Sequence, residues 1–349
     1  MLMHITDLET PSVLIDLDIM AGNIQRMQAI CNDHGLDFRP HTKTHKIPAI
    51  AQQQLEVGAV GIACQKVSEA EVFAEAGINN IQLPYNIVGE SKTRRLVELS
   101  TYNRITVSAD HTLVVAGLAD AAKALDMSIR VMVELGTAIE RTGTSPHECV
   151  QLAKRIDADP NLHFAGVLVY PSNVSARPAL QETLDALHRA GIGVDSVSGG
   201  GSGAIQDVGD MTELTELRVG TYIFWDWQSV QKGWTTLDTC AMRVAATVVS
   251  RPTSDRAILD SGSKSLAADR YDDRHGYVVE YPEARIYKLN EEHAYVDFSA
   301  CAERPVIGER VHVIPVHTCV VTNLHNAIYG VRDGLVEETW PVAARGLVR

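Results

Sequence analysis

Short apolar runs alternate with amphipathic stretches along the first two-thirds of the chain. The segments between these runs carry apolar residues at the spacing of a helix. Alternating strands and helices are typical of a parallel sheet whose strands are joined by helical crossovers. The runs predicted as strands are 12–17, 36–43, 60–65, 81–86, 105–110, 129–135, 164–170, 195–201 and 216–224.

The pattern changes after about residue 238. From there, alternating apolar and polar positions recur in segments joined by short turns, and no helix of normal length is predicted. This indicates a second domain built of β-strands, with a boundary between Trp234 and Cys240. Eight strands close a (β/α)8 barrel, so one of the nine earlier runs must lie elsewhere, and the first run is the best candidate.

Composition limits the partners that the chain can have. Its 349 residues, 45% of them hydrophobic, suit one barrel-sized domain and a smaller one. The net charge of -13 argues against nucleic acid and anionic membranes as partners. The six cysteines are scattered without a CxxC pair, and no secretion signal or long apolar stretch is present. We therefore expect a cytoplasmic protein without a membrane span.

A basic segment follows the second predicted strand. Arg39, Lys43 and Lys46 lie within eight residues, together with His41 and His45. Cationic neighbours and partial burial lower the pKa of a lysine, and a neutral lysine can attack an aldehyde to form a Schiff base. A basic loop that is solvated or binds phosphate would show the same pattern.

A glycine-rich segment follows another predicted strand. Residues 198–203 read Ser-Gly-Gly-Gly-Ser-Gly, and their backbone amides can approach a phosphate closely because glycine has no Cβ. Gly220 and Thr221 follow the next strand and could add two more amides. A flexible turn would also be rich in glycine. Lys43 and a phosphate-binding loop in one barrel together predict a site for pyridoxal 5'-phosphate (PLP).

His317 and Cys319 are two residues apart in a predicted strand. A period of two places both side chains on one face, where an imidazole and a thiolate make half of a transition-metal site. The spacing alone is unspecific. Thiolate softness favours zinc.

Five segments together resemble the D-threonine aldolase and D-serine dehydratase family of alanine-racemase-like PLP enzymes. The resemblance runs from about Thr10 to Gly346, and its segments are 39–46, 64–72, 83–89, 198–203 and 317–331. It implies a PLP-binding (β/α)8 TIM barrel over residues 18–236 and a C-terminal antiparallel β domain formed by residues 1–17 and 237–349. The first run, 12–17, would then pair with the C-terminal strands. A homodimer is also implied by analogy.

The resemblance implies roles for individual residues. Lys43 resembles the Schiff-base lysine, with His41 beside it as a candidate proton shuttle, and Arg141 would hold a substrate carboxylate or a cofactor anion. Tyr170, Arg141 and Arg218 could instead be structural: the tyrosine in the core, the arginines in ion pairs. The implied cofactor contacts are Tyr170 against the ring, Arg218 at the pyridine nitrogen, and Ser202, Gly220 and Thr221 at the phosphate with Gly200 and Gly201 beside them; the implied ligands of a divalent metal are His317 and Cys319.

Two reactions fit these residues. The first is aldol cleavage of a D-3-hydroxy-amino acid, such as D-threonine, to glycine and an aldehyde. The alternative is dehydration of D-serine or D-3-hydroxyaspartate to a 2-oxo acid and ammonia. The metal would be manganese, zinc or magnesium, and Cys319 stands where family aldolases tend to carry aspartate. A non-catalytic PLP-binding homeostasis protein is a third interpretation, but such proteins lack the extra β domain, and no motif supplies the tyrosine that a racemase needs.

Overall fold

The computed structural model describes residues 3–349, which form two compact units. One unit contains Met27–Lys43, Pro48–Gly220 and Leu347–Arg349. The other contains the residues up to Arg26, the short segment Thr44–Ile47, and Thr221–Gly346. The chain therefore changes unit immediately after Lys43.

The first unit is built on a parallel sheet of eight strands, in the order β3-β10-β9-β8-β7-β6-β5-β4. Its two end strands are also joined, because His41 forms a parallel bridge with Ala63 and the Ala63 N–H donates to the Pro40 carbonyl at 2.8 Å. The sheet thus closes into the predicted eight-stranded barrel. The strands are β3 (Asp37–Phe38), β4 (Ile62–Ala63), β5 (Asn80–Asn86), β6 (Arg104–Ala109), β7 (Ile129–Leu135), β8 (Leu162–Val169), β9 (Ser196–Gly200) and β10 (Glu216–Arg218).

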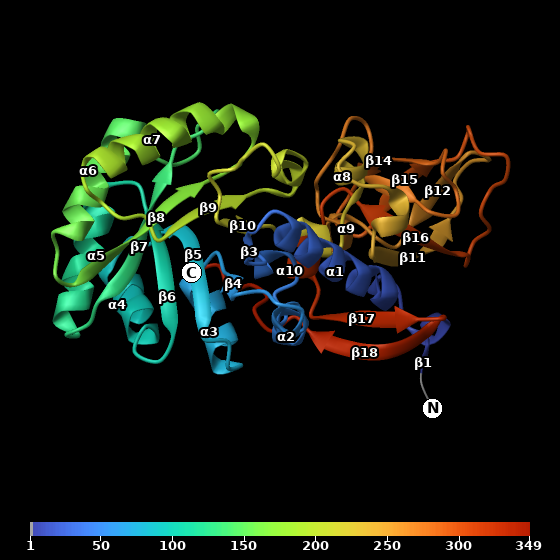
Figure 1. Cartoon of the computed structure of the whole chain (residues 1–349). Coiled ribbons are helices and arrows are strands. Elements are labelled where there is room, and N and C mark those ends of the chain that lie inside the picture. The colour runs from blue at the N-terminus through green and yellow to red at the C-terminus, as the bar shows by residue number, and fades with distance from the viewer. Residues whose placement is uncertain (1–2) are drawn as a thin grey trace. The chain divides into compact units, whose positions relative to one another are not determined.

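Amphipathic helices lie on the outer face of these strands (Figure 1). The start of α6 shows how the sequence forms them, because Ser145 accepts from the Glu148 N–H, Glu148 accepts from the Ser145 N–H, and Pro146 opens the first turn. The face of α6 that contains Cys149, Leu152 and Ile156 is buried. The helices that connect the runs are α1 (Leu17–Asp33), α2 (Pro48–Glu56), α3 (Val67–Glu75), α4 (Glu90–Leu99), α5 (Thr112–Ala124), α6 (Pro146–Asp157) and α7 (Arg177–Arg189).

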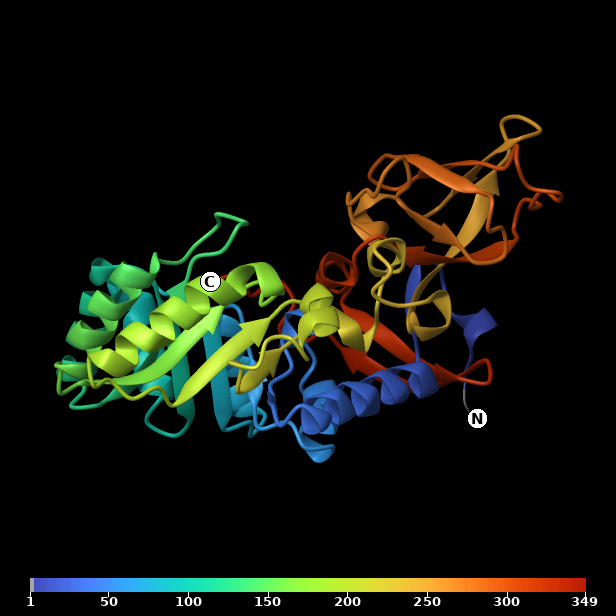
Figure 2. The same ribbon diagram turned by 45° about the horizontal axis from the view of Figure 1, so that its top comes forward.

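The second unit contains a ten-stranded sheet, whose C-terminal hairpin is red in Figure 2. The first predicted run, β2, pairs antiparallel with β11 and parallel with β17, so it lies outside the barrel as expected. The β2–β17 pair makes the sheet mixed rather than purely antiparallel. The elements are β1 (Met3–His4), β2 (Ser12–Asp16), β11 (Met242–Ser250), β12 (Arg256–Leu259), β13 (Gly276–Val278), β14 (Arg285–Leu289), β15 (Ala294–Asp297), β16 (Arg310–Pro315), β17 (Ala327–Arg332) and β18 (Leu335–Pro341), with helices α8 (Trp227–Gln231), α9 (Ser263–Leu266) and α10 (Thr318–Leu324).

The boundary between the two compact units lies after Gly220, earlier in the chain than the boundary predicted from the sequence pattern. One reason is the buried side chain of Asn23, which donates to the carbonyls of Ile223 at 3.1 Å and Thr239 at 2.9 Å. These bonds hold the stretch that includes α8 within the second unit. Across residues 3–349, the structure contains no helix with both the length and the apolar character needed to cross a bilayer.

Candidate active site

Lys43 lies in a short 3-10 helix, Thr42–Thr44, which follows β3 at the carboxyl end of the barrel strands. Its N–H donates to His41 Nδ1 at 3.3 Å, and His41 Nε2 lies 3.0 Å from Gln65 Oε1. The Thr42 hydroxyl donates to the Ala63 carbonyl at 3.1 Å. These bonds tie the loop to β4, while the Lys43 side chain remains half-buried. Catalytic groups of barrel enzymes lie at this end of the strands.

The glycine-rich segment passes from the end of β9 into a 3-10 helix, Ser202–Asp207. A Cβ at Gly200 would lie 2.9 Å from the Arg218 carbonyl oxygen, so only glycine fits between these strands without a shift. Gly201 has φ +106°, a conformation that favours glycine. Ser202 and Gly203 open this 3-10 helix, where the first backbone N–H groups have no acceptor within the helix. Backbone amides at such a turn suit the oxygens of a phosphate.

Arg218 is fully enclosed on β10, and a chain of side chains holds it. Its Nε donates to Ser198 Oγ at 2.7 Å, and Ser198 donates to Glu216 Oε1 at 2.5 Å. Arg39 pairs with the other oxygen of Glu216 at 2.6 Å. Burial lowers the pKa of Arg218 to about 10, and Glu216 and Glu134 oppose this shift, so the guanidinium stays charged at neutral pH. Arg218 has no carboxylate of its own among the described residues.

Arg141 and Tyr170 meet at the carboxyl end of β7 and β8. The Arg141 guanidinium lies 4.5 Å from the centre of the Tyr170 ring. Arg141 is exposed and lines a cavity of about 430 Å³ formed by residues 136–137 and 140–146. This cavity gives the guanidinium room to bind an anion, which is compatible with the predicted contact with a carboxylate.

The strand predicted around His317 and Cys319 is wrong. β16 ends at Pro315, His317 precedes the first turn of α10, and Cys319 lies in that turn. The β-branched residues of this stretch favour a strand, but Thr318, Val321 and Thr322 are buried at helical spacing, and Thr322 bonds back to the Thr318 carbonyl. The two side chains still meet, because Cys319 forms a hydrogen bond with the His317 ring.

Asp226 holds the other side of the His317 ring. Its Oδ2 lies 2.8 Å from His317 Nδ1, and the carboxylate is almost fully buried. Burial lowers the pKa of His317, but Cys319 and Asp226 outweigh this effect and raise it to about 11. Among residues 3–349, no cluster of three or more His, Cys, Asp or Glu side chains is arranged around a cation. His317 and Cys319 would therefore supply two ligands, which leaves positions for water and substrate.

Three buried residues near these groups carried no signal in the sequence. Thr44 is fully buried, and its hydroxyl lies 3.2 Å from Cys319 Sγ. Asp226 lies far from His317 in the chain, and Glu134 accepts from the Thr142 hydroxyl at 2.7 Å. No motif surrounds any of the three. Only the position of Thr44 beside the predicted lysine could have suggested it.

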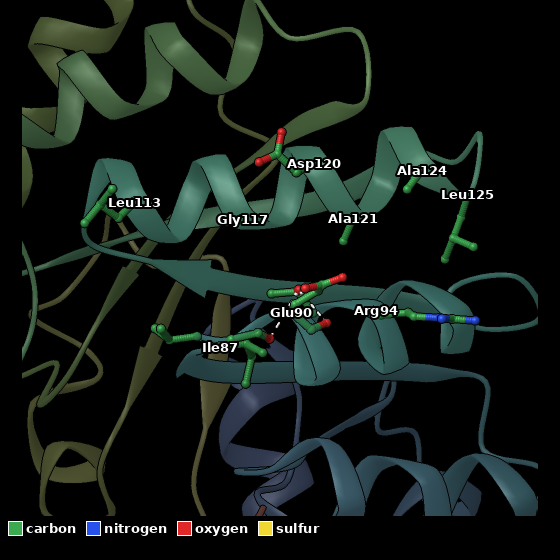
Figure 3. A pocket seen from close by; sticks show the side chains of 12 residues that line it. Ile87, Glu90, Arg94, Leu113, Gly117, Asp120, Ala121, Ala124 and Leu125 are labelled. Atoms are coloured by element: carbon green, nitrogen blue, oxygen red, sulfur yellow. Dashed lines mark hydrogen bonds between the residues drawn. The ribbon is translucent and has the colours of Figure 1, made fainter.

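A separate groove of about 620 Å³ lies between α4 and α5, on the outside of the barrel unit (Figure 3). Gly117, Ala121 and Ala124 line the groove on the α5 side with no large side chain, and Leu113 lies at one end of it. It contains none of the predicted site residues. The residues predicted from the sequence as site residues therefore lie outside this groove.

Comparisons with known proteins match this arrangement of domains. Residues 15–226 match the family model "Alanine racemase, N-terminal domain", and residues 241–331 match "Putative serine dehydratase domain". A D-threonine aldolase from Arthrobacter sp is 33% identical, over 98% of this chain and 94% of that protein. A D-threo-3-hydroxyaspartate dehydratase from Delftia sp. (strain HT23) is 27% identical over 95% of this chain and 97% of that protein.

Solved structures agree with these matches. The crystal structure of D-threonine aldolase from Filomicrobium marinum superposes with a TM-score of 0.93 at 31% identity, and the comparison covers 100% of this chain and 99% of that one. An alanine racemase from Clostridium difficile 630 shares the fold alone, with a TM-score of 0.72 at 13% identity over 96% of this chain and 99% of that one. The chain therefore belongs to the D-threonine aldolase and D-serine dehydratase family of alanine-racemase-like, fold-type III PLP enzymes.

Proposed function

We propose that this enzyme is a PLP- and divalent-metal-dependent aldolase that cleaves D-3-hydroxy-amino acids of the D-threonine type to glycine and an aldehyde. The observation that carries the proposal is the 33% identity to a D-threonine aldolase over nearly the full length of both chains. The close superposition on a second D-threonine aldolase supports it.

The barrel residues fit the cofactor. Lys43 is the amine that would hold it, Ser202, Gly220 and Thr221 would bind the phosphate beside Gly200 and Gly201, and Tyr170 would lie against the ring. The N–H groups at the start of the 3-10 helix Ser202–Asp207 and the close backbone approach at Gly200, which a Cβ would block, support this assignment. Arg218 would face the pyridine nitrogen, and a charged guanidinium there donates to the nitrogen without protonating it.

The His317–Cys319 pair fits a divalent metal. A thiolate and an imidazole are ligands that zinc accepts, and manganese or magnesium would bind Cys319 less readily. A solved cysteine-to-alanine mutant of a D-threo-3-hydroxyaspartate dehydratase is in the metal-free form, and that chain is 25% identical to this one with a TM-score of 0.88. When bound, PLP supplies a ring that draws electrons away from Cα, and the metal supplies a Lewis acid for the β-hydroxyl.

The chain's own residues have separate tasks in this proposal. Arg141 binds the substrate carboxylate and so orients the molecule. Lys43 and His41 hold or accept protons at the carboxyl end of β3, where the bond from the Lys43 N–H to His41 Nδ1 keeps the two residues together. His317 and Cys319 place the cation, and Asp226 and Thr44 hold those ligands.

The second candidate is dehydration of D-serine or D-3-hydroxyaspartate, and Cys319 is the observation that favours it. Family aldolases tend to carry aspartate at this position, whereas the thiolate resembles dehydratase members. The Delftia dehydratase also superposes with a TM-score of 0.89 at 25% identity, over 97% of this chain and 98% of that one.

Product analysis separates the two reactions. Purified enzyme with PLP and either Mn²⁺ or Zn²⁺ is incubated with D-threonine, D-serine or D-threo-3-hydroxyaspartate. Glycine and acetaldehyde from D-threonine support the aldolase, whereas ammonia and a 2-oxo acid establish the dehydratase. Lys43→Ala is the control, and it should lose both turnover and the visible absorbance of bound cofactor. Cofactor absorbance without turnover of any substrate would indicate a carrier.

A further inference from the structure

Asp226 occupies an unusual position for a carboxylate, because it is about 99% buried without a lysine or arginine partner among the described residues. A buried charge is costly unless hydrogen bonds compensate it. Three donors do so here. The Ser229 N–H and hydroxyl donate to Oδ1 at 2.8 Å and 2.5 Å, and His317 Nδ1 lies 2.8 Å from Oδ2.

The two oxygens of Asp226 therefore have different and fixed tasks. Oδ1 must accept, because both of its partners on Ser229 are donors. Ser229 is itself buried, so no water replaces these bonds. Oδ2 is left to accept from the imidazole, which requires the proton of a neutral ring to be on Nδ1. The other nitrogen, Nε2, then presents its lone pair on the side of the ring away from Asp226.

We propose that Asp226 is a positioning residue that keeps His317 in the Nδ1–H tautomer, so that Nε2 binds the divalent metal together with Cys319. The proposal rests on the metal site of the proposed function and adds a residue that no motif or family comparison indicated. Carboxylates that orient metal-bound histidines in this way typically contribute 10–100-fold to metal affinity.

Asp226→Asn tests the proposal with almost no change in shape. Ser229 requires an acceptor, so the asparagine carbonyl faces Ser229 and its NH₂ group faces His317. The ring must then accept at Nδ1, which places the proton on Nε2, where the metal should bind. Asparagine is also a good residue at the start of a helix, and Asp226 precedes α8, so the variant should fold.

The measurement is Zn²⁺ affinity by competition with a chromophoric chelator, made on the PLP-loaded enzyme. We expect Asp226→Asn to weaken Zn²⁺ binding by about 10–100-fold. Asp260→Asn is the matched control, because Asp260 also accepts from a backbone N–H and a hydroxyl but bonds to threonines rather than a histidine. It should leave the affinity unchanged. Ser229→Ala keeps the backbone donor and should have a smaller effect than Asp226→Asn.

Two different failures can be distinguished. If wild-type enzyme binds Zn²⁺ no better than His317→Ala, the metal site of the proposed function is wrong, and the role of Asp226 is wrong with it. If wild type binds through His317 but Asp226→Asn binds equally well, only the positioning role is overturned. Crystals of Zn²⁺-loaded Asp226→Asn provide a second readout, in which an unchanged Nε2–Zn²⁺ bond would also contradict it.

Discussion

The hydroxyl of Thr44 lies 3.2 Å from the sulfur of Cys319, although 275 positions separate the two residues in the chain. Thr44 is bonded directly to Lys43, and it is fully buried. The residue beside the proposed cofactor lysine therefore touches a proposed metal ligand. In the proposed function, Thr44 would connect the residue that holds PLP with a residue that holds the metal.

Thr44→Val should weaken metal binding while the fold is preserved. Valine keeps the shape of threonine but removes the hydroxyl, so Cys319 loses a partner that holds its side chain. A buried hydrogen bond of this kind contributes about 1 kcal/mol, which corresponds to an affinity roughly fivefold lower. Titration with Zn²⁺ measures the change, and Thr44→Ser should restore the affinity. Equal affinities for the valine and serine variants would show that the hydroxyl has no role.

Cys319→Asp should change the metal that the enzyme prefers. Carboxylate oxygen is a hard ligand that suits Mn²⁺, whereas the thiolate is soft and suits Zn²⁺. We expect the ratio of Zn²⁺ to Mn²⁺ affinity to fall by about tenfold or more. Parallel titrations of both metals give the ratio. Cys319→Ser is the control, and it should weaken the binding of both metals without favouring Mn²⁺.

Gly200→Ala should reduce PLP affinity. The added Cβ would lie 2.9 Å from the Arg218 carbonyl, so β9 and β10 must shift where Arg218 and the glycine loop are held. We expect about tenfold weaker cofactor binding for such a displacement. Absorbance titration of the PLP-free enzyme measures it. Gly193→Ala is the control, because no atom lies within 4 Å of its added Cβ, and it should titrate like wild type.

Glu134→Gln should alter the pH dependence of stability. Burial raises the pKa of Glu134 above its ordinary value of 4.5, while Thr142, Arg141 and Arg218 oppose this shift. Because the folded state holds the proton more tightly, wild type should lose stability as the pH rises from about 4.5 through the raised pKa. Glutamine cannot ionise and should escape this loss, so its advantage in urea unfolding should be absent near pH 4 and present at pH 8.

Glu148→Gln provides a control of opposite sign for this experiment. Bonds from the Ser145 N–H and hydroxyl lower the pKa of Glu148, so its contribution to stability is present above the ordinary pKa and is lost as the pH falls. Replacing the Glu148 carboxylate by an amide should lower the free energy of unfolding at pH 8 but leave it unchanged in strong acid. If both variants show the same pH dependence of stability, burial does not control the titration of Glu134.

The sequence predicts the fold better than the site. Strand and helix periods identify the barrel strands, and counting nine runs shows that one of them must lie elsewhere, with 12–17 as the best candidate. The local sequence pattern predicts the wrong element at His317. Its β-branched residues favour a strand, but the burial of one helical face favours the helix that the structure shows. The pattern also misses Asp226 and Thr44. Their roles depend on contacts across 91 and 275 positions, which leave no local spacing to recognise.

The change of unit between Lys43 and Thr44 limits how this enzyme can be divided for engineering. Thr44–Ile47 belongs to the unit that contains Thr221–Gly346, yet the chain on both sides of this segment belongs to the barrel. A gene fragment that encodes the barrel alone would have to omit or refill four residues immediately after the lysine. Domain exchange between relatives should therefore carry residues 44–47 from the same parent as the C-terminal domain.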